Sequence, residues 1–332
     1  MRRIGKMFPV IAAGSAAILT LTVTACANGG GVIPAAQAQV QGVEKPNLTV
    51  AVVPAVDSAG FFIALHDGLF KDQGLNVHFV PAISSETVIA DQVKGTVDIT
   101  GGNYVSYIQA QQSGQADLDI FAEGSVMEPG AQGLYTMPDS PIKTLADLEG
   151  KTVGINAPKN ILYLLVASVL AEHNIPVNSV HFADYPLPTM AAALKAGKIQ
   201  AAVLPEPFAS QAAQQYGVIT LADLNQGATA AFPVQGYVVT RQWAAENPRT
   251  LTAFNTALQE GQELADTNRA VLEQAMEHVP DGLGVSQKTA AIMAVDLYPV
   301  GAVDNVRLQR VADVMSQFLG FPAFNVRSMV GG

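Results

Sequence analysis

The 332-residue sequence has few charged residues, fewer basic than acidic ones, and a single cysteine. Charged residues make up 14% of the chain, well below the share of about 25% that is common in soluble proteins. The 28 acidic residues outnumber the 18 basic ones, which disfavours nucleic-acid binding because that function needs a basic face. One cysteine excludes a disulfide framework, an iron–sulfur cluster and a cysteine-rich zinc site.

Short motifs of catalysis are missing as well. The five histidines form no HExxH pair, and there is neither a G-x-S-x-G nucleophile turn nor a phosphate-binding loop. We therefore expect no catalytic residue, no metal and no cofactor. Hydrophobic residues, in contrast, make up 49% of the chain, which supplies a core and argues against disorder of the whole chain. The length suggests about two domains.

Residues 1–25 are typical of an export signal. A basic stretch at 2–6 precedes an apolar run at 7–21, which is short for a transmembrane helix of about 20 residues. Small residues from Val23 onward then lead to Cys26, the lone cysteine, and this arrangement resembles the lipobox of bacterial lipoproteins. We expect cleavage before Cys26, lipid attachment to its thiol, and anchoring to the outer face of the cytoplasmic membrane. An ordinary signal peptide is the alternative.

The segment 26–46 is rich in Gly, Ala, Gln and Pro and lacks periodicity, so we expect a flexible tether. No other segment carries 18 uncharged apolar residues, so membrane contact is expected through the N-terminal lipid only. Anionic headgroups would repel the acidic body, so the lipid rather than charge would hold it to the membrane.

The body of the chain alternates between strand-like and helix-like segments, which predicts an α/β fold with parallel sheets covered by helices. A first series of apolar β-rich runs lies at 48–53, 75–80, 97–100 and 118–122. A second series lies at 151–155, 180–184 and 199–204, separated by predicted helices at 160–173 and 189–196. Two similar open-sheet units in one chain suggest two facing lobes.

Two further runs, 133–137 and 236–240, are predicted as strands that return to the first sheet. On this reading, lobe I comprises 47–139 and 235–332, and lobe II comprises 140–234. The predicted helices after Trp243 would pack back on lobe I; they cover 248–266, 269–278, 287–297 and 306–319.

Five stretches together resemble a known family: 53–62, 68–75, 140–153, 188–197 and 204–208. They are similar to segments of the solute-binding proteins of nitrate/sulfonate/taurine ABC importers, whose relatives bind the pyrimidine precursor of thiamine. The resemblance covers about 47–265. It implies a two-lobed, type II periplasmic-binding-protein fold, with an open, mostly parallel sheet in each lobe and a ligand cleft between them. It further implies an extracytoplasmic receptor that delivers a small molecule to an ABC permease, and we expect a monomer.

Candidate ligand-binding residues follow from the strand order. In open α/β sheets, ligands sit beyond the carboxyl ends of the strands, where helix N-termini offer free N–H groups and a positive dipole end. The residues at these ends are Asp57, Phe61, Ser84, Ser85, Gly102, Asn103, Tyr104, Asn156, Lys159, Asn160, Asp184, Tyr185, Glu206 and Phe208.

Each candidate also has a purely structural interpretation. Ser84 and Ser85 suit either an anion or a helix cap, and Glu206 either faces the cleft or caps the next helix. The aromatic candidates either stack a flat ligand or pack in the core. The turn 156–160 departs from the family, in which small Gly, Ser and Thr residues are usual at this turn. Its Pro158 also removes one N–H donor. Lys159 could supply a charge in its place.

The charges near the predicted cleft do not identify the ligand, because the candidates there include several carboxylates and one lysine. A sulfonate-, nitrate- or taurine-like anion and a neutral or amine-bearing heterocycle both stay open. Two other functions remain as alternatives: a surface lipoprotein that binds a protein partner, and an enzyme on the same fold. The enzymes of this fold are cytosolic, and the thiamine-pyrimidine synthase among them needs a cysteine cluster that this chain lacks.

Overall fold

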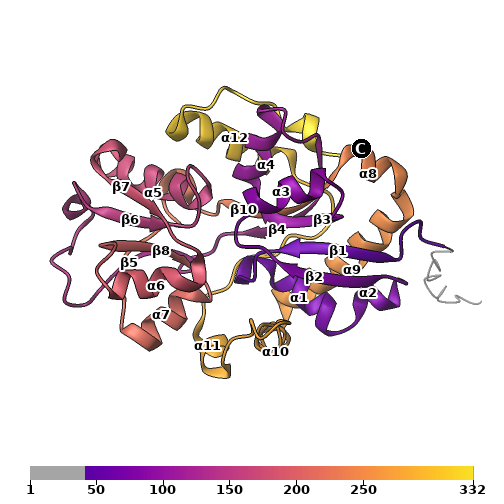
Figure 1. The fold of residues 1–332 in the computed structure, drawn as a ribbon, viewed down its shortest axis with the longest axis horizontal. Helices are drawn as coiled ribbons and strands as arrows, with labels where there is room; N and C mark the ends of the chain where they lie inside the picture. The colour runs from indigo at the N-terminus through magenta and orange to yellow at the C-terminus, as the bar shows by residue number, and fades with distance from the viewer. Residues whose placement is uncertain (1–41, 332) are drawn as a thin grey trace, which may run out of the picture. The chain divides into compact units, whose positions relative to one another are not determined.

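The computed structural model describes residues 42–331 and contains two mixed five-stranded sheets (Figure 1). The predicted signal segment, Cys26 and most of the predicted tether lie outside the described residues. The first sheet has the order β2 (Asn76–Pro81), β1 (Asn47–Val52), β3 (Ile99–Asn103), β10 (Pro233–Thr240) and β4 (Leu118–Val126). The second has the order β7 (His181–Asp184), β6 (Thr152–Ile155), β8 (Ala201–Pro205), β5 (Gln132–Thr136) and β9 (Ile219–Asp223).

Each sheet is parallel except for its fourth strand, and that strand comes from the segment that has just crossed between the sheets. In the first sheet β10 runs antiparallel to β3 and β4, so the strand at 236–240 joins the first sheet as predicted, and its direction is a finding of the structure. In the second sheet β5 runs antiparallel to β8 and β9. The prediction that 133–137 returns to the first sheet is therefore wrong. An apolar run favours a buried strand but does not encode which sheet it joins.

Helices cover both sheets and follow the strands in alternation (Figure 1). They are α1 (Ala59–His66), α2 (Leu69–Asp72), α3 (Ser85–Val93), α4 (Tyr104–Gln112), α5 (Ile161–Glu172), α6 (Leu187–Lys195), α7 (Phe208–Tyr216), α8 (Arg241–Glu246), α9 (Pro248–Thr267), α10 (Arg269–Glu277), α11 (Gln287–Ile292) and α12 (Asn305–Leu319). No bounds were predicted for α7, β9 was not predicted, and α11 is shorter than the predicted helix at 287–297. Among residues 42–331, no helix combines the length and apolarity needed to cross a membrane.

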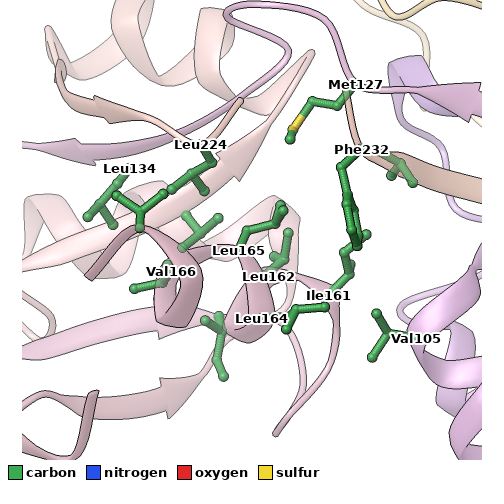
Figure 2. Close-up of a cluster of buried hydrophobic side chains, with 14 of the residues drawn as sticks. Val105, Met127, Leu134, Ile161, Leu162, Leu164, Leu165, Val166, Leu224 and Phe232 are labelled. Carbon is green, nitrogen blue, oxygen red and sulfur yellow. The ribbon is translucent and has the colours of Figure 1, made fainter. Parts of the chain in front are cut away.

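Helix α5, which was predicted at 160–173, is buried on nearly every side. Its sequence is almost continuously apolar, and a helix of that kind has to be enclosed. Figure 2 shows Ile161, Leu162 and Leu165 of α5 in one cluster with Met127 and Phe232, which lie in the segments that join the two sheets. The hydrophobic core of the second sheet thus extends to the crossings.

The two crossing segments are bonded to each other and to α12. The Met127 backbone N–H donates to the Phe232 carbonyl at 2.8 Å. The guanidinium of Arg310 on α12 donates to the carbonyls of Ala228 at 2.9 Å and Ala230 at 2.6 Å, and lies 5.8 Å from the centre of the Phe232 ring. These contacts fix the course of the chain where it passes from the second sheet back to the first.

Candidate functional site

A small cavity of about 40 Å³ lies where the carboxyl ends of parallel strands from both sheets meet. This is the place at which open α/β sheets bind ligands. Its lining combines apolar side chains with a few polar groups from eight separate chain segments. The lining residues are Val53, Ala55, Asp57, Ser85, Gly102, Asn103, Gln132, Asn156, Ile161, Leu162, Leu187, Pro205 and Val234.

A larger hollow of about 720 Å³ lies beside α12, away from these strand ends. Its lining includes Arg307 and Arg310, but both guanidinium groups already have partners. Arg307 pairs with Glu123 at 2.9 Å, and Arg310 binds the crossing segment. We therefore place the candidate site at the small cavity, where the carboxyl ends of strands from both sheets meet.

The first sheet contributes a linked set of polar side chains from α3, β3 and α4. Asn103 ends β3 and caps α4, because its Oδ1 accepts from the Ser106 backbone N–H at 2.9 Å. Its own backbone N–H and its Nδ2 both donate to the Ser85 Oγ at 2.9 Å. Gly102 permits this approach, since an added Cβ would lie 2.9 Å from the Ser85 Cβ. Ser85 is thereby held in one position at the first turn of α3.

Asp57 lies in the one-turn helix η1 (Val56–Ser58), directly after β1. The Ser58 hydroxyl donates to its Oδ1 at 3.3 Å, and the Gln235 amide, oriented with its nitrogen toward η1, donates to the same oxygen at 3.1 Å. Burial raises the pKa of Asp57 to about 7, because a charged carboxylate is poorly solvated there. The carboxyl group therefore changes its charge close to neutral pH.

The second sheet contributes Asn156, which follows β6, and a neighbouring asparagine that orients it. Asn160 is fully buried and caps α5, with its Oδ1 accepting from Leu162 at 3.1 Å and Tyr163 at 3.3 Å. Its Nδ2 donates to the Asn156 Oδ1. Asn160 therefore positions Asn156 at the cavity without lining the cavity itself.

Several predicted candidates lie away from the cavity lining. Those outside it are Phe61, Ser84, Tyr104, Lys159, Asn160, Asp184, Tyr185, Glu206 and Phe208. Phe61 packs in the core with its ring centre 5.4 Å from that of Phe62. The buried ring of Tyr104 fills the space beside Gly236.

The remaining candidates of this group lie at the surface or pack against the core of the second sheet. Lys159 and Asp184 are exposed, and the Lys159 carbonyl accepts from the Gln109 amide of α4 at 2.7 Å. Tyr185 and Phe208 are half-buried and pack against the core of the second sheet. A ligand-binding role for these residues stays a prediction from the sequence.

Glu206 stands at the end of β8, and its carboxylate is directed to α7. Its Oε2 accepts from the Ser210 backbone N–H at 3.1 Å, and its Oε1 accepts from the Ser210 hydroxyl at 2.8 Å. Burial raises the pKa of Glu206, and the two bonds from Ser210 oppose that rise. Its carbonyl accepts from the Val56 N–H at 2.9 Å, which connects β8 to η1 of the first sheet.

We expect Glu206→Gln to act on stability and leave ligand affinity within twofold of the wild type. The amide keeps one acceptor for Ser210 and loses the other, so the expected loss is about 1 kcal/mol. Urea unfolding measures the first effect, and calorimetric titration with any ligand found for the wild type measures the second. A tenfold loss of affinity at unchanged stability would instead place Glu206 in the binding site.

Gln132 is the polar lining residue that the sequence analysis missed. It begins β5 and is 3% exposed, and its Oε1 has no hydrogen-bond partner among the described residues. An antiparallel strand starts where its parallel neighbours end, so its first residues reach the same edge of the sheet. This rule on strand direction could have indicated Gln132 from the sequence. It could be applied only after β5 had been assigned to the second sheet.

The described residues contain no group of three or more His, Cys, Asp or Glu side chains that could hold a metal ion. The polar groups at the cavity are a carboxyl, a hydroxyl and amides, and Lys, Arg and His are absent from its lining. Chemically, this arrangement can bind a small molecule by hydrogen bonds.

Comparison with solved structures gives the fold class. The chain is similar to the alkanesulfonate-binding protein SsuA from Xanthomonas axonopodis pv. citri bound to MOPS, with a TM-score of 0.70, 19% identity, and coverage of 87% of this chain and 99% of that one. It is also similar to the periplasmic nitrate-binding protein NrtA from Synechocystis PCC 6803, with a TM-score of 0.72, 16% identity, and coverage of 86% and 85%. The predicted two-lobed α/β binding-protein fold is thereby confirmed.

A family model described as NMT1/THI5 like matches residues 55–268, so the chain belongs to the NMT1/THI5-like family. Two curated relatives are transport components of Synechocystis sp. strain PCC 6803. The bicarbonate transport ATP-binding protein CmpC is 30% identical over 241 residues, and the nitrate import ATP-binding protein NrtC is 26% identical over 248. These alignments cover 66% and 69% of this chain but only 35% and 36% of the relatives, so the chain spans about a third of their length.

Proposed function

We propose that this protein is a solute-binding component of an ABC import system, which captures a small molecule between its two sheets and delivers it to a permease. The observation that carries the proposal is the cavity at the facing strand ends, with polar side chains from both sheets directed to one space. The family membership and the transport roles of its relatives support the same interpretation.

The size of the cavity favours a compact ligand. About 40 Å³ is only slightly more than the volume of about 30 Å³ that one water molecule takes up in the liquid. A nitrate-, hydrogencarbonate- or short sulfonate-like molecule suits that space, whereas a thiamine-precursor-like heterocycle would require the two sheets to lie further apart. Ligand binding would then stabilise the arrangement in which η1 and β8 are bonded to each other.

A thermal-shift screen of the purified full chain tests this function. The panel holds nitrate, hydrogencarbonate, taurine, alkanesulfonates, thiamine pyrimidines, amino acids and polyamines. At about 100 times its Kd a ligand stabilises the protein by about 2.7 kcal/mol, which raises the Tm by several degrees. Binding has to be stoichiometric, with the ligand recovered unchanged. Turnover of the ligand would point to an enzyme, and no shift with any compound would favour a protein partner.

The location is a separate part of the proposal. Export, cleavage before Cys26 and lipid attachment would hold the receptor at the outer face of the membrane beside its permease. Mass spectrometry of the mature N-terminus in a bacterial host measures the lipid directly. We expect a diacylglycerol-modified cysteine in the wild type and an unprocessed, unlipidated chain in Cys26→Ala. An unmodified Cys26 in the wild type would contradict the anchor and leave the binding function untouched.

A further inference from the structure

The polar groups at the cavity have unused hydrogen-bonding capacity of both kinds. The Ser85 hydroxyl accepts two bonds from Asn103 but donates none among the described residues. The Asn156 Nδ2 is likewise without an acceptor in the described part of the chain, because its side-chain bond to Asn160 is made through Oδ1. The Gln132 Oε1 is a buried acceptor without a donor. A buried polar atom is rarely left unpaired, so the Gln132 Oε1 points to a ligand, and the free donors of Ser85 and Asn156 line the same cavity.

Asp57 supplies the one carboxyl group of the lining. Ser58 and Gln235 hold one of its oxygens from the protein side, at 3.3 Å and 3.1 Å. An ionised carboxylate accepts hydrogen bonds and donates none. A ligand atom that meets it therefore has to carry a hydrogen, because two facing acceptors would repel each other and both would stay unsatisfied.

The rest of the electrostatic environment tolerates a negative charge. Four helices begin at the cavity, with Ser85 at the start of α3, Asn103 capping α4, Ile161 at the start of α5 and Leu187 at the start of α6. Their N-terminal ends carry partial positive charge. Among the described residues, Lys, Arg and His are absent from the lining, so no side-chain cation attracts a ligand by its charge alone.

We propose that the cavity selects a compact molecule that donates a hydrogen bond to Asp57 while accepting hydrogen bonds from Ser85 and Asn156, with Gln132 completing its coordination. This inference rests on the proposed solute-binding function and narrows its ligand class. Neutral small amides and monoanionic oxyacids that retain an O–H meet both requirements. Planar anions that only accept hydrogen bonds fail at Asp57, although their size is suitable.

Calorimetric titration of the full chain with two matched pairs of probes tests this selectivity. The first pair is hydrogencarbonate and nitrate, which have the same planar shape but differ in one O–H. The second pair is acetamide and acetate. The buffer is held at pH 8.5, where Asp57 is ionised because its pKa is about 7. In at least one pair we expect measurable binding, with the donor-bearing member at least tenfold tighter.

Two variants show whether the proposed residues cause the preference. Asp57→Asn offers an N–H to the ligand, so its preference within a pair should fall below threefold. Gln132→Met removes the unpartnered amide at similar length. It should weaken binding at least tenfold while leaving the stability of the free protein unchanged or raised, which a merely structural residue would not do. Asp139→Asn, at an exposed site outside the lining, is the matched control and should bind as the wild type does.

The outcomes separate this inference from the proposed function. Equal or tighter binding of nitrate and acetate by the wild type would overturn the donor requirement and leave the receptor function intact. Binding of none of the four probes would overturn the proposed ligand class, and the wider thermal-shift panel would then decide on the receptor function. The wild-type pairs are informative even where a variant fails to fold.

Discussion

Gly102→Ala is expected to abolish ligand binding and to destabilise the protein. An added Cβ at this position would contact the Ser85 Oγ, and would lie 2.9 Å from both the Ser85 Cβ and the Tyr107 hydroxyl oxygen. Backbone hydrogen bonding holds β3 in the middle of its sheet, so Ser85 and the start of α3 have to move instead. Overpacking of this kind costs about 1–3 kcal/mol. The displaced Ser85 hydroxyl would no longer face the cavity.

Calorimetric titration and thermal unfolding of Gly102→Ala measure the two effects. We expect a loss of affinity of at least a hundredfold for any ligand of the wild type, together with a Tm lowered by several degrees. Gly154→Ala in β6 is the control, because its Cβ would lie 2.5 Å from the Ile199 Cδ1 and 3.3 Å from the Met190 Cγ, and neither residue lines the cavity. It should lose similar stability but retain affinity. Unchanged binding by Gly102→Ala would contradict the location of the site.

The second large effect concerns Asp296, a buried carboxyl in the loop between α11 and α12. This loop is fixed beside the site, because Leu297 pairs with Val126 of β4 and the Tyr298 hydroxyl donates to the Val56 carbonyl of η1 at 2.7 Å. Burial, followed by the nearby charge of Asp57, raises the pKa of Asp296 to about 8, while the Ser125 hydroxyl and the Glu128 N–H oppose the rise. The group is therefore neutral in the folded protein at pH 7.

The sign of the pH dependence follows from this raised pKa. Between about pH 4 and pH 8 the folded state keeps a proton that an unfolded aspartate, with its pKa near 3.9, has released. The contribution of Asp296 is therefore most favourable below pH 4, declines as the pH rises through this window, and levels off above pH 8. The free energy of unfolding of the wild type should accordingly fall between pH 5 and pH 8.

Asp296→Asn should remove most of this loss in the free energy of unfolding, since the amide is neutral at every pH. We expect the variant to be more stable than the wild type by about 3 kcal/mol at pH 8, or roughly 6 °C in Tm, and nearly equal to it at pH 4.5. Urea unfolding at both pH values measures the difference. Asp139→Asn changes an exposed aspartate and serves as the control. A variant less stable than the wild type at pH 8 would show that the charged carboxylate is needed.

Much of the candidate site could be predicted because its polar residues follow strand ends directly in the sequence. Asp57, Ser85, Gly102, Asn103 and Asn156 were chosen on that rule, and all five line the cavity. Their contact with a ligand stays a prediction. The apolar part of the lining was not predicted, because an apolar residue such as Leu162 or Val234 looks the same in a sequence whether it faces a cavity or the core.

Other candidates were placed away from the cavity for reasons that local sequence does not contain. Tyr104 follows Asn103 directly, but as the first residue of α4 it turns to the packed side, where Gly236 leaves room for its ring. Glu206 had two interpretations from the sequence, and in the structure its carboxylate accepts from Ser210 of α7. Each choice depends on which neighbour packs against the residue, and that neighbour is distant in the chain or on the next element.

By itself, the sequence determined the alternation of strands and helices, the helix starts at Asn103 and Asn160, and the family. These features depend on hydrophobic periodicity and on caps that act within a few residues. The tertiary structure alone decided that β5 joins the second sheet and brings Gln132 to the cavity. It also decided which buried polar groups are left for a ligand. Strand pairing and hydrogen-bond completion depend on segments far apart in the sequence, and only packing brings those segments together.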